Sequence, residues 1–144
     1  MAKSKYFKSE EEYKKVMSAL FDQLKVNEVG KELAKSNLII KFVYTSPDCS
    51  VTLDGKNKPK DGGAYGDYFW NENKLKEDVT LTGTADYSLR FWQGKENPVI
   101  SIALGKLKAK GNVAAALALL PIIKPAYKLF PKILKEMGRP DLVV

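Results

Sequence analysis

The chain has 144 residues, 44% of them hydrophobic and 28% charged, a balance typical of one globular domain with its own core. This composition excludes a disordered protein, and the longest apolar run, residues 113–123, is too short for a membrane-spanning helix of roughly 20 residues. The formal net charge is +7, and residues 104–144 carry most of it.

Two absences narrow the chemistry. The chain has no histidine, and its single cysteine, Cys49, can form neither an internal disulfide nor a thiolate metal cluster. The 17 Asp and Glu leave a carboxylate mechanism open in principle, but no nucleophile motif is present. We therefore expect no catalytic residue, no metal and no cofactor. The lone cysteine and the absence of an apolar signal segment predict a cytoplasmic location.

The first 35 residues predict two helices. Ser9 and Glu12 have the spacing of a capping box, and the apolar residues that follow share one helical face as far as Leu24. Asn27 can cap a second, short helix through Ala34, although Gly30 lowers the helix propensity there.

Strands come next. Apolar, β-branched and aromatic residues alternate from residue 38 to 45, and residues 51–54, 65–70 and 79–82 predict three further strands. A turn at Pro47-Asp48 and short connections favour antiparallel pairing between neighbours.

The second half is predicted to be mainly helical. Thr84 can cap a helix through Gln93, and Asn97-Pro98 starts another through Leu104. The lysine-rich residues 106–110 alternate as a short fifth strand.

Asn112 can cap an apolar helix over residues 113–120. The prolines at 121, 125 and 131 rule out one long straight helix beyond it. Residues 121–144 are therefore predicted to form a proline-kinked helical segment that closes at Gly138.

An ordered set of motifs between Asp78 and Pro121 resembles the sterol carrier protein 2 (SCP2) family. The set comprises Asp78-Val79-Thr80-Leu81, residues 86–92, Gly94-Lys95, Asn97-Pro98, the apolar residues 99–104 and the run from Gly105 to Asn112. No single piece is specific, but their order and spacing together are. Residues 36–76 fit the family's opening strands more loosely.

The resemblance implies an α+β fold in which helices cover a five-stranded, mainly antiparallel sheet, with an apolar tunnel between them. It makes residues 1–144 one lipid-binding domain, with N-terminal helices in residues 1–35 and the kinked segment in residues 121–144. It implies non-enzymatic binding and transfer or presentation of fatty acids, fatty acyl-CoA or sterol-like lipids. The last residues, Asp141 to Val144, are not a peroxisomal signal, which again favours the cytoplasm.

The residues expected to contact lipid are Leu81, Phe91, Trp92, Val99, Ile100, Ile102, Ala103, Leu104, Ala115, Leu119, Leu120 and Ile123. The helix over residues 98–104 is apolar on nearly every side, so we expect a ligand or a partner subunit to cover what the small domain cannot. Ordinary core packing is the competing interpretation for each residue taken alone. A chain of about 16 carbons would gain roughly 12 kcal/mol before the entropic cost of binding.

Lysines flank this apolar region. Lys106, Lys108 and Lys110 share one face of the fifth strand, where they either contact a phosphate or carboxylate headgroup or protect an edge strand from pairing. Lys124 and Lys128 belong to a basic face that fits either an anionic membrane surface or a solvated helix. Arginine is scarce here, which argues against nucleic-acid binding.

Three functions compete at this stage. The first is a lipid carrier, the second an accessory domain that presents a lipid substrate to a partner enzyme, and the third a structural dimerisation module. Both a monomer and a homodimer remain open.

Overall fold

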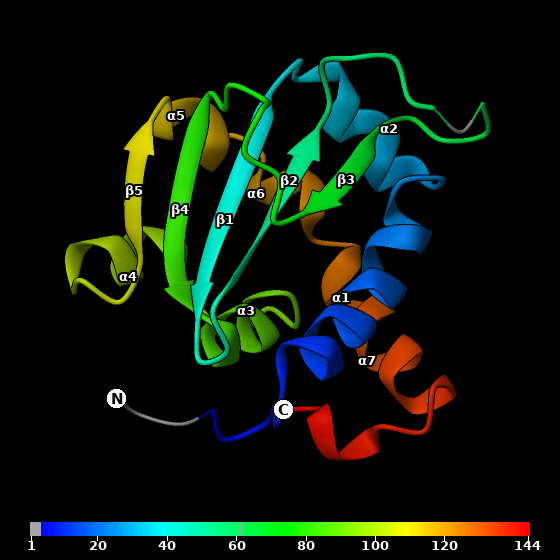
Figure 1. Ribbon diagram of the computed structural model, residues 1–144, viewed down its shortest axis with the longest axis vertical. Coiled ribbons are helices and arrows are strands. Elements are labelled where there is room, and N and C mark those ends of the chain that lie inside the picture. The colour runs from blue at the N-terminus through cyan, green and yellow to red at the C-terminus, as the bar shows by residue number, and fades with distance from the viewer. Residues whose placement is uncertain (1–3, 61) are drawn as a thin grey trace.

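The computed structural model describes residues 4–60 and 62–144 and shows a sheet with helices packed behind it as drawn in Figure 1. The strands are β1 (Ile39–Thr45), β2 (Cys49–Asp54), β3 (Asp67–Trp70), β4 (Val79–Thr84) and β5 (Lys108–Gly111). They lie in the order β3-β2-β1-β4-β5. Three neighbouring pairs are antiparallel and β1–β4 is parallel. The predicted α+β fold with a mainly antiparallel five-stranded sheet is confirmed.

The parallel pair arises from the segment that joins β3 to β4. Residues 71–78 return across the front of the sheet in Figure 1, so that β4 starts at the same end as β1. The backbone N–H of Asn71 donates to the carbonyl oxygen of Ser50 at 2.7 Å, and that of Asp78 donates to the carbonyl oxygen of Ile39 at 2.8 Å. The neighbours β1–β2 and β2–β3 pair antiparallel as predicted, whereas β3 and β4, which also follow each other in the sequence, do not pair with each other.

Both predicted N-terminal helices form, as α1 (Glu10–Leu24) and α2 (Glu28–Lys35). The Ser9 hydroxyl accepts a hydrogen bond from the backbone N–H of Glu12 at 3.1 Å, as the capping box predicts. Gly30 is needed for close packing: a Cβ at this position would lie 2.0 Å from the carbonyl oxygen of Leu24. The residue that weakens α2 locally thus lets it pack against the end of α1.

The second half forms α3 (Ala85–Phe91), α4 (Pro98–Ala103), α5 (Val113–Leu117), α6 (Leu120–Ile123), α7 (Ala126–Glu136) and the short 3₁₀ turn Pro140–Leu142. The single helix predicted over residues 113–120 is wrong in detail, because α5 ends at Leu117 and a new turn begins at Leu120. The predicted kink is confirmed, since residues 113–123 and α7 meet at 65°.

The main core lies between the sheet and the helices α1, α3 and α7. Its fully buried side chains include Tyr13, Met17, Leu20, Phe130 and Leu134. Across the described residues, no single helix is long and apolar enough to cross a membrane; only the bent pair of residues 113–123 and 126–136 together reaches that length and composition.

The C-terminal residues are fixed to this core by one buried side chain. The Gln93 amide donates to the carbonyl oxygen of Leu142 at 2.9 Å and accepts from the backbone N–H of Val144 at 3.0 Å. The side chain of Gln93 therefore holds the C-terminal residues against the core.

Candidate lipid-binding site

An apolar cavity of about 100 Å³ lies between the sheet and the helices of the second half. None of its 24 lining residues has a charged side chain. The sheet supplies one wall through Ile40, Phe42 and Leu81, and the helices supply the opposite one. The cavity therefore lies between the two layers of the fold.

Strand alternation explains how the sheet forms its wall. In β1, Ile40, Phe42 and Tyr44 all line the cavity, because successive side chains point to opposite faces of a strand and alternate residues share one face. Leu107, just before β5, lines the cavity as well, while its neighbours Lys106 and Lys108 are exposed.

Seven residues that the sequence predicted to contact lipid are brought together around this cavity. They are Leu81, Phe91, Trp92, Ile102, Leu119, Leu120 and Ile123. The sequence interpretation missed the contributions of β1, of Leu33 and Leu38, and of Val113, Ala116 and Leu117. The alternation in β1 was visible in the sequence and could have identified its inward residues.

The other five predicted residues do not line the cavity. Val99, Ile100 and Leu104 are 55%, 56% and 66% exposed, and Ala103 is also exposed. Ala115 is half-buried, one position away from the lining residue Ala116. These placements correct the predicted lining.

The physical reason lies in the position of α4 at the edge of the sheet, beside β5 (Figure 1). Pro98 and Ile102 face the cavity there, so the other side of the same short helix must face outward. The structure describes no protein group that covers this outer side.

The five lysines proposed for headgroup or membrane contact all lie on the surface. Lys106, Lys108, Lys110, Lys124 and Lys128 are exposed, and none has an ion-pair partner within residues 4–60 and 62–144. None of them lines the cavity.

The few polar groups beside the cavity are neutral. The lining residues Tyr44, Tyr87, Ser88 and Trp92 each hold a buried polar atom with no hydrogen-bond partner among the described residues. Burial raises the pKa of the Tyr44 hydroxyl, and the nearby hydroxyls of Ser88 and Tyr13 lower it by less. Neither hydroxyl forms a hydrogen bond of good geometry with Tyr44. A charged group in the cavity would lose its hydration without gaining a counter-charge, which is costly.

A second cavity of about 60 Å³ adjoins the first, near the end of α1 and the start of α2. Both cavities are lined by Leu33, Leu53, Gly55 and Trp92. The second differs in charge, because Lys25, Asp54 and Asp67 contribute to its lining. The two spaces are thus neighbours with a shared apolar wall.

No group of three Asp, Glu, Cys or His side chains within the described part of the chain could hold a metal ion. Cys49 is free and buried, and burial raises the pKa of its thiol to about 12. A thiol in that state is not a nucleophile near neutral pH.

The fold and the uncharged cavity define an α+β protein with a site suited to apolar molecules. The sequence profile of the SCP-2 sterol transfer family matches residues 17–124. The chain belongs to this family, which supports lipid binding or transfer as its general function and is generally non-catalytic.

One solved structure supports this assignment, and two others share the fold. Sterol carrier protein 2 from Yarrowia lipolytica, in its apo form, is 30% identical with a TM-score of 0.58, and the match covers 87% of this chain and 96% of that one. The sterol carrier protein domain 2 of Helicoverpa armigera is 22% identical with a TM-score of 0.54, covering 89% and 96%. The UbiJ-SCP2 ubiquinone synthesis protein is 14% identical with a TM-score of 0.58, covering 83% and 95%. No curated protein sequence matches the chain.

Proposed function

We propose that this protein binds one apolar lipid, such as a fatty acid, a fatty acyl-CoA or a sterol-like molecule, and transfers or presents it without altering it. The observation that carries this proposal is the cavity wall, because none of its 24 residues is charged. Family membership supports lipid as the ligand class.

The size of the cavity sets a condition on this function. An apolar cavity of about 150 Å³ accommodates a molecule the size of benzene, and the first cavity measures about 100 Å³. A long acyl chain therefore requires side chains to move, and the shared wall of Leu33 and Trp92 is where the first cavity can extend into the second.

Charge sets the orientation of an anionic ligand. Its headgroup stays outside the uncharged first cavity, and Asp54 and Asp67 disfavour it at the second. The surface near α4 and β5 carries exposed Lys106, Lys108 and Lys110. We therefore place a carboxylate or phosphate headgroup on that side. Lys124 and Lys128 lie at the end of α6 and in α7, and we propose them as membrane contacts instead.

The test compares two alanines that are close in the chain, of which only one lines the cavity. Ala116 lines the cavity, whereas Ala118 is exposed and does not line it. We expect Ala116→Trp to weaken binding of a fluorescent fatty acyl probe about tenfold or more, and Ala118→Trp to leave it unchanged. Organic extraction of the purified wild type, followed by mass spectrometry, should recover a lipid. Equal affinity in the two folded variants, or no binding by the wild type, would contradict the proposal.

The absence of catalysis is part of the proposal and has its own assay. We expect purified protein to release no free thiol from palmitoyl-CoA above the rate without protein. Steady release that a point substitution abolishes would overturn it. A cytoplasmic location is likewise proposed, in keeping with the free thiol of Cys49, and cell fractionation tests it.

A second candidate is presentation of a lipid to a partner enzyme. The similarity in fold to the UbiJ-SCP2 ubiquinone synthesis protein is consistent with such a role. A sec-alkylsulfatase, Pisa1 from Pseudomonas sp., contains a region of similar fold that makes up 15% of its chain, with 16% identity and a TM-score of 0.55. Co-purification with a lipid-modifying enzyme, lost in Ala116→Trp, would favour this candidate.

A further inference from the structure

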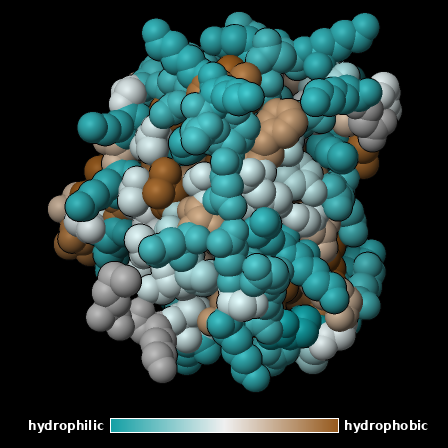
Figure 2. All heavy atoms as spheres, in the orientation of Figure 1, coloured by the Kyte–Doolittle hydropathy of each residue, from teal (hydrophilic) through white to brown (hydrophobic). Residues whose placement is uncertain are grey.

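Helix α4 presents two apolar faces. Pro98 and Ile102 line the cavity on one face. The opposite face exposes four apolar side chains that fall at helical spacing: Val99, Ile100, Ala103 and Leu104. Figure 2 shows hydrophobic residues gathered at the left edge of the molecule, where Figure 1 places α4. A contiguous apolar surface of this kind marks a site of interaction.

The charges that follow α4 in the chain have one sign. Residues 97–111 contain three lysines and no Asp or Glu. Lys95 precedes α4, and Lys106 follows it, with its backbone N–H donating to the carbonyl oxygen of Ser101 at 2.9 Å. Both lysines are exposed, as are Lys108 and Lys110 on the adjoining strand β5.

The acidic residue that adjoins α4 in sequence is neutralised. The Glu96 carboxylate is paired with the guanidinium of Arg90 at 2.8 Å and is mostly buried. The surface that remains available therefore combines exposed apolar side chains with cations.

An anionic lipid bilayer satisfies both features. A bilayer with anionic headgroups offers an apolar interior under a negative surface, and binding to it scales with the apolar area buried and with the electrostatic attraction. A second copy of this chain fits poorly, because a two-fold contact through α4 would bring the same lysines together.

We propose that α4 is the docking site for an anionic lipid bilayer. Val99, Ile100 and Leu104 enter the headgroup region, while Lys95, Lys106, Lys108 and Lys110 contact anionic lipids. The purpose of docking rests on the proposed lipid-carrier function. Because α4 lines the cavity with its other face and a helix is about 10–12 Å across with its side chains, docking through α4 leaves only the width of one helix between the cavity and the bilayer.

The apolar part of the proposal is tested with phosphatidylcholine vesicles with and without phosphatidylglycerol, measured by flotation. The double variant Ile100→Gln/Leu104→Gln should bind the anionic vesicles about tenfold or more weakly, because it removes apolar area from the interface. The matched control is Val26→Gln, which removes a 49% exposed apolar side chain in the turn between α1 and α2. The control should bind as the wild type does.

The electrostatic part uses two triple variants with the same net charge. Each lysine near an anionic surface is worth about a fivefold change in affinity. Lys106→Gln/Lys108→Gln/Lys110→Gln should therefore lose on the order of a hundredfold and most of the salt dependence. Lys15→Gln/Lys31→Gln/Lys58→Gln removes three exposed lysines elsewhere and should lose much less.

Several outcomes would overturn the proposal. One is a wild type that does not float with anionic vesicles, and another is equal losses in a test variant and its control. A concentration-dependent dimer abolished by Ile100→Gln/Leu104→Gln would make the face a self-interface instead. Binding of a water-soluble fluorescent lipid, measured without vesicles, reports on the proposed function separately. If the double variant fails to fold, Val99→Gln alone serves as the test.

Discussion

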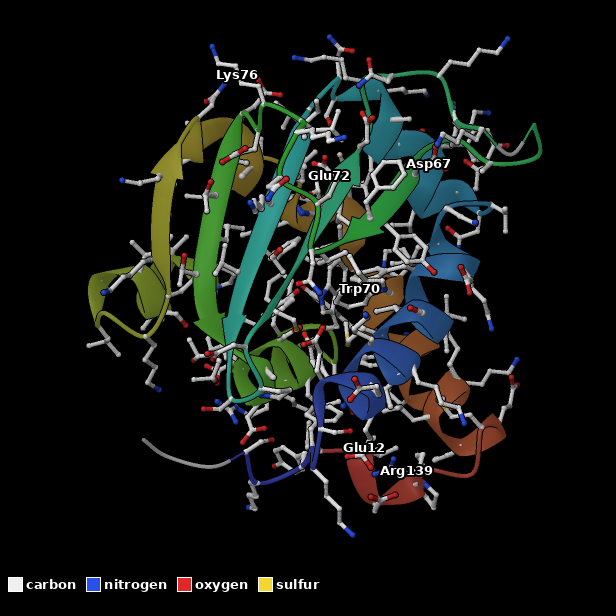
Figure 3. The ribbon with its side chains drawn as sticks, viewed as in Figure 1. Glu12, Asp67, Trp70, Glu72, Lys76 and Arg139 are labelled. Carbon is white, nitrogen blue, oxygen red and sulfur yellow. The ribbon has the colours of Figure 1, made fainter. Side chains whose placement is uncertain are left out.

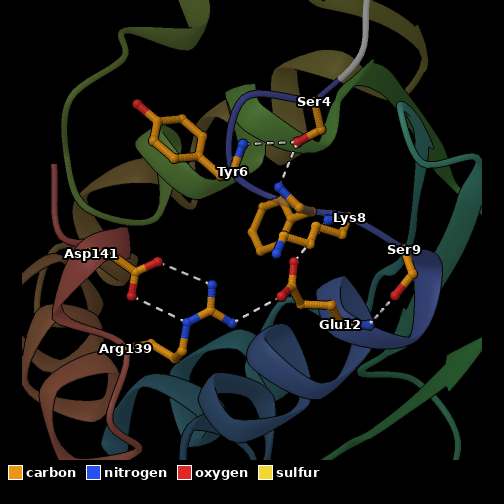
Figure 4. Close-up of polar contacts among 8 residues, drawn as sticks. Ser4, Tyr6, Lys8, Ser9, Glu12, Arg139 and Asp141 are labelled. Carbon is orange, nitrogen blue, oxygen red and sulfur yellow. Dashed lines mark hydrogen bonds and ion pairs between the residues drawn. The ribbon is translucent and has the colours of Figure 1, made fainter.

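The guanidinium of Arg139 lies 3.2 Å from the carboxylate of Glu12, 127 positions earlier in the chain. Figure 3 shows the two side chains facing each other below the sheet, and Figure 4 shows that Arg139 also pairs with Asp141 at 3.1 Å. Glu12 in addition accepts a hydrogen bond from the backbone N–H of Lys8 at 2.8 Å. One arginine thus links the start of α1 to the segment that follows α7.

Arg139→Gln should lower the melting temperature modestly. The pair with Glu12 is partly exposed, with 27% and 25% of the two side chains accessible, so roughly 1 kcal/mol is at stake. That corresponds to about 2–4 °C for a domain of this size. Arg139→Lys should recover only part of the loss, because lysine lacks the planar fork. Calorimetry of both variants beside Lys132→Gln, an exposed lysine of α7, is the measurement; an equal drop in the control would contradict the assignment.

Stability in acid should depend on Asp78. The backbone N–H of Ile39 donates to its carboxylate at 2.8 Å, and this bond, with the ammonium of Lys56, lowers the pKa of the Asp78 carboxyl from its ordinary value. A lowered folded-state pKa stabilises the protein above the unfolded-state pKa and ceases to do so as the pH falls through the folded-state value.

Asp78→Asn should therefore be less stable than the wild type at pH 7, and the gap should narrow below about pH 4. Urea denaturation midpoints at pH 7, 5 and 3.5 measure this. Glu136→Gln replaces an exposed acid without a hydrogen bond or ion pair among the described residues and should track the wild type. A constant gap between Asp78→Asn and the wild type at every pH would refute the electrostatic origin.

In Gly30→Ala, a gain in helix propensity competes with a steric clash in a closely packed place. Alanine favours the helix by about 1 kcal/mol, but its Cβ would lie 2.0 Å from the carbonyl oxygen of Leu24. Packing should dominate, with a net loss of about 2–3 kcal/mol in the free energy of unfolding. Gly62→Ala is the control, because a Cβ added at this position would have nothing within 4 Å. If Gly30→Ala were as stable as the wild type, α2 would be able to shift without cost.

Leu33 should control the length of the ligand. It lines both cavities, whereas Leu38 lines only the first. Leu33→Ala should join the two spaces and move the preferred fatty acid to longer chains, while Leu38→Ala should enlarge only the first. Affinities for saturated chains of graded length give the profile. Identical profiles for both variants would mean that the ligand does not pass Leu33.

Cys49 should react slowly with thiol reagents. Burial is the largest cause of its raised pKa of about 12, followed by the negative charge of Glu10. Relative to an ordinary thiol of pKa 9.0, the thiolate fraction at pH 8 falls roughly a thousandfold. Labelling with a chromogenic disulfide should be slow in buffer and fast in denaturant, and it should accelerate about tenfold per pH unit. Rapid labelling of the native protein at pH 8 would contradict the buried position.

Local signals in the sequence located most elements. Ser9, Asn27, Thr84, Asn97 and Asn112 each cap a helix that was predicted from them. Caps and strand alternation depend on neighbours a few residues away, which is why a single sequence reveals them.

Properties that depend on distant contacts were harder to predict. The sequence showed that α4 is apolar all round, but burial of one face depends on the position of α4 at the sheet edge, which no local pattern encodes. The outward direction of Val99 and Leu104 was missed for this reason. The parallel β1–β4 pair was missed because it depends on the path of residues 71–78.

The uncharged wall of the first cavity has a consequence for how an occupant should be identified. A surface with so few directional groups sorts molecules by length and volume rather than by chemical identity. Whatever lipid fills the cavity in an expression host would then reflect what that host makes in quantity. Competition between equimolar lipids, rather than the inventory of one extract, is the experiment that separates preference from supply.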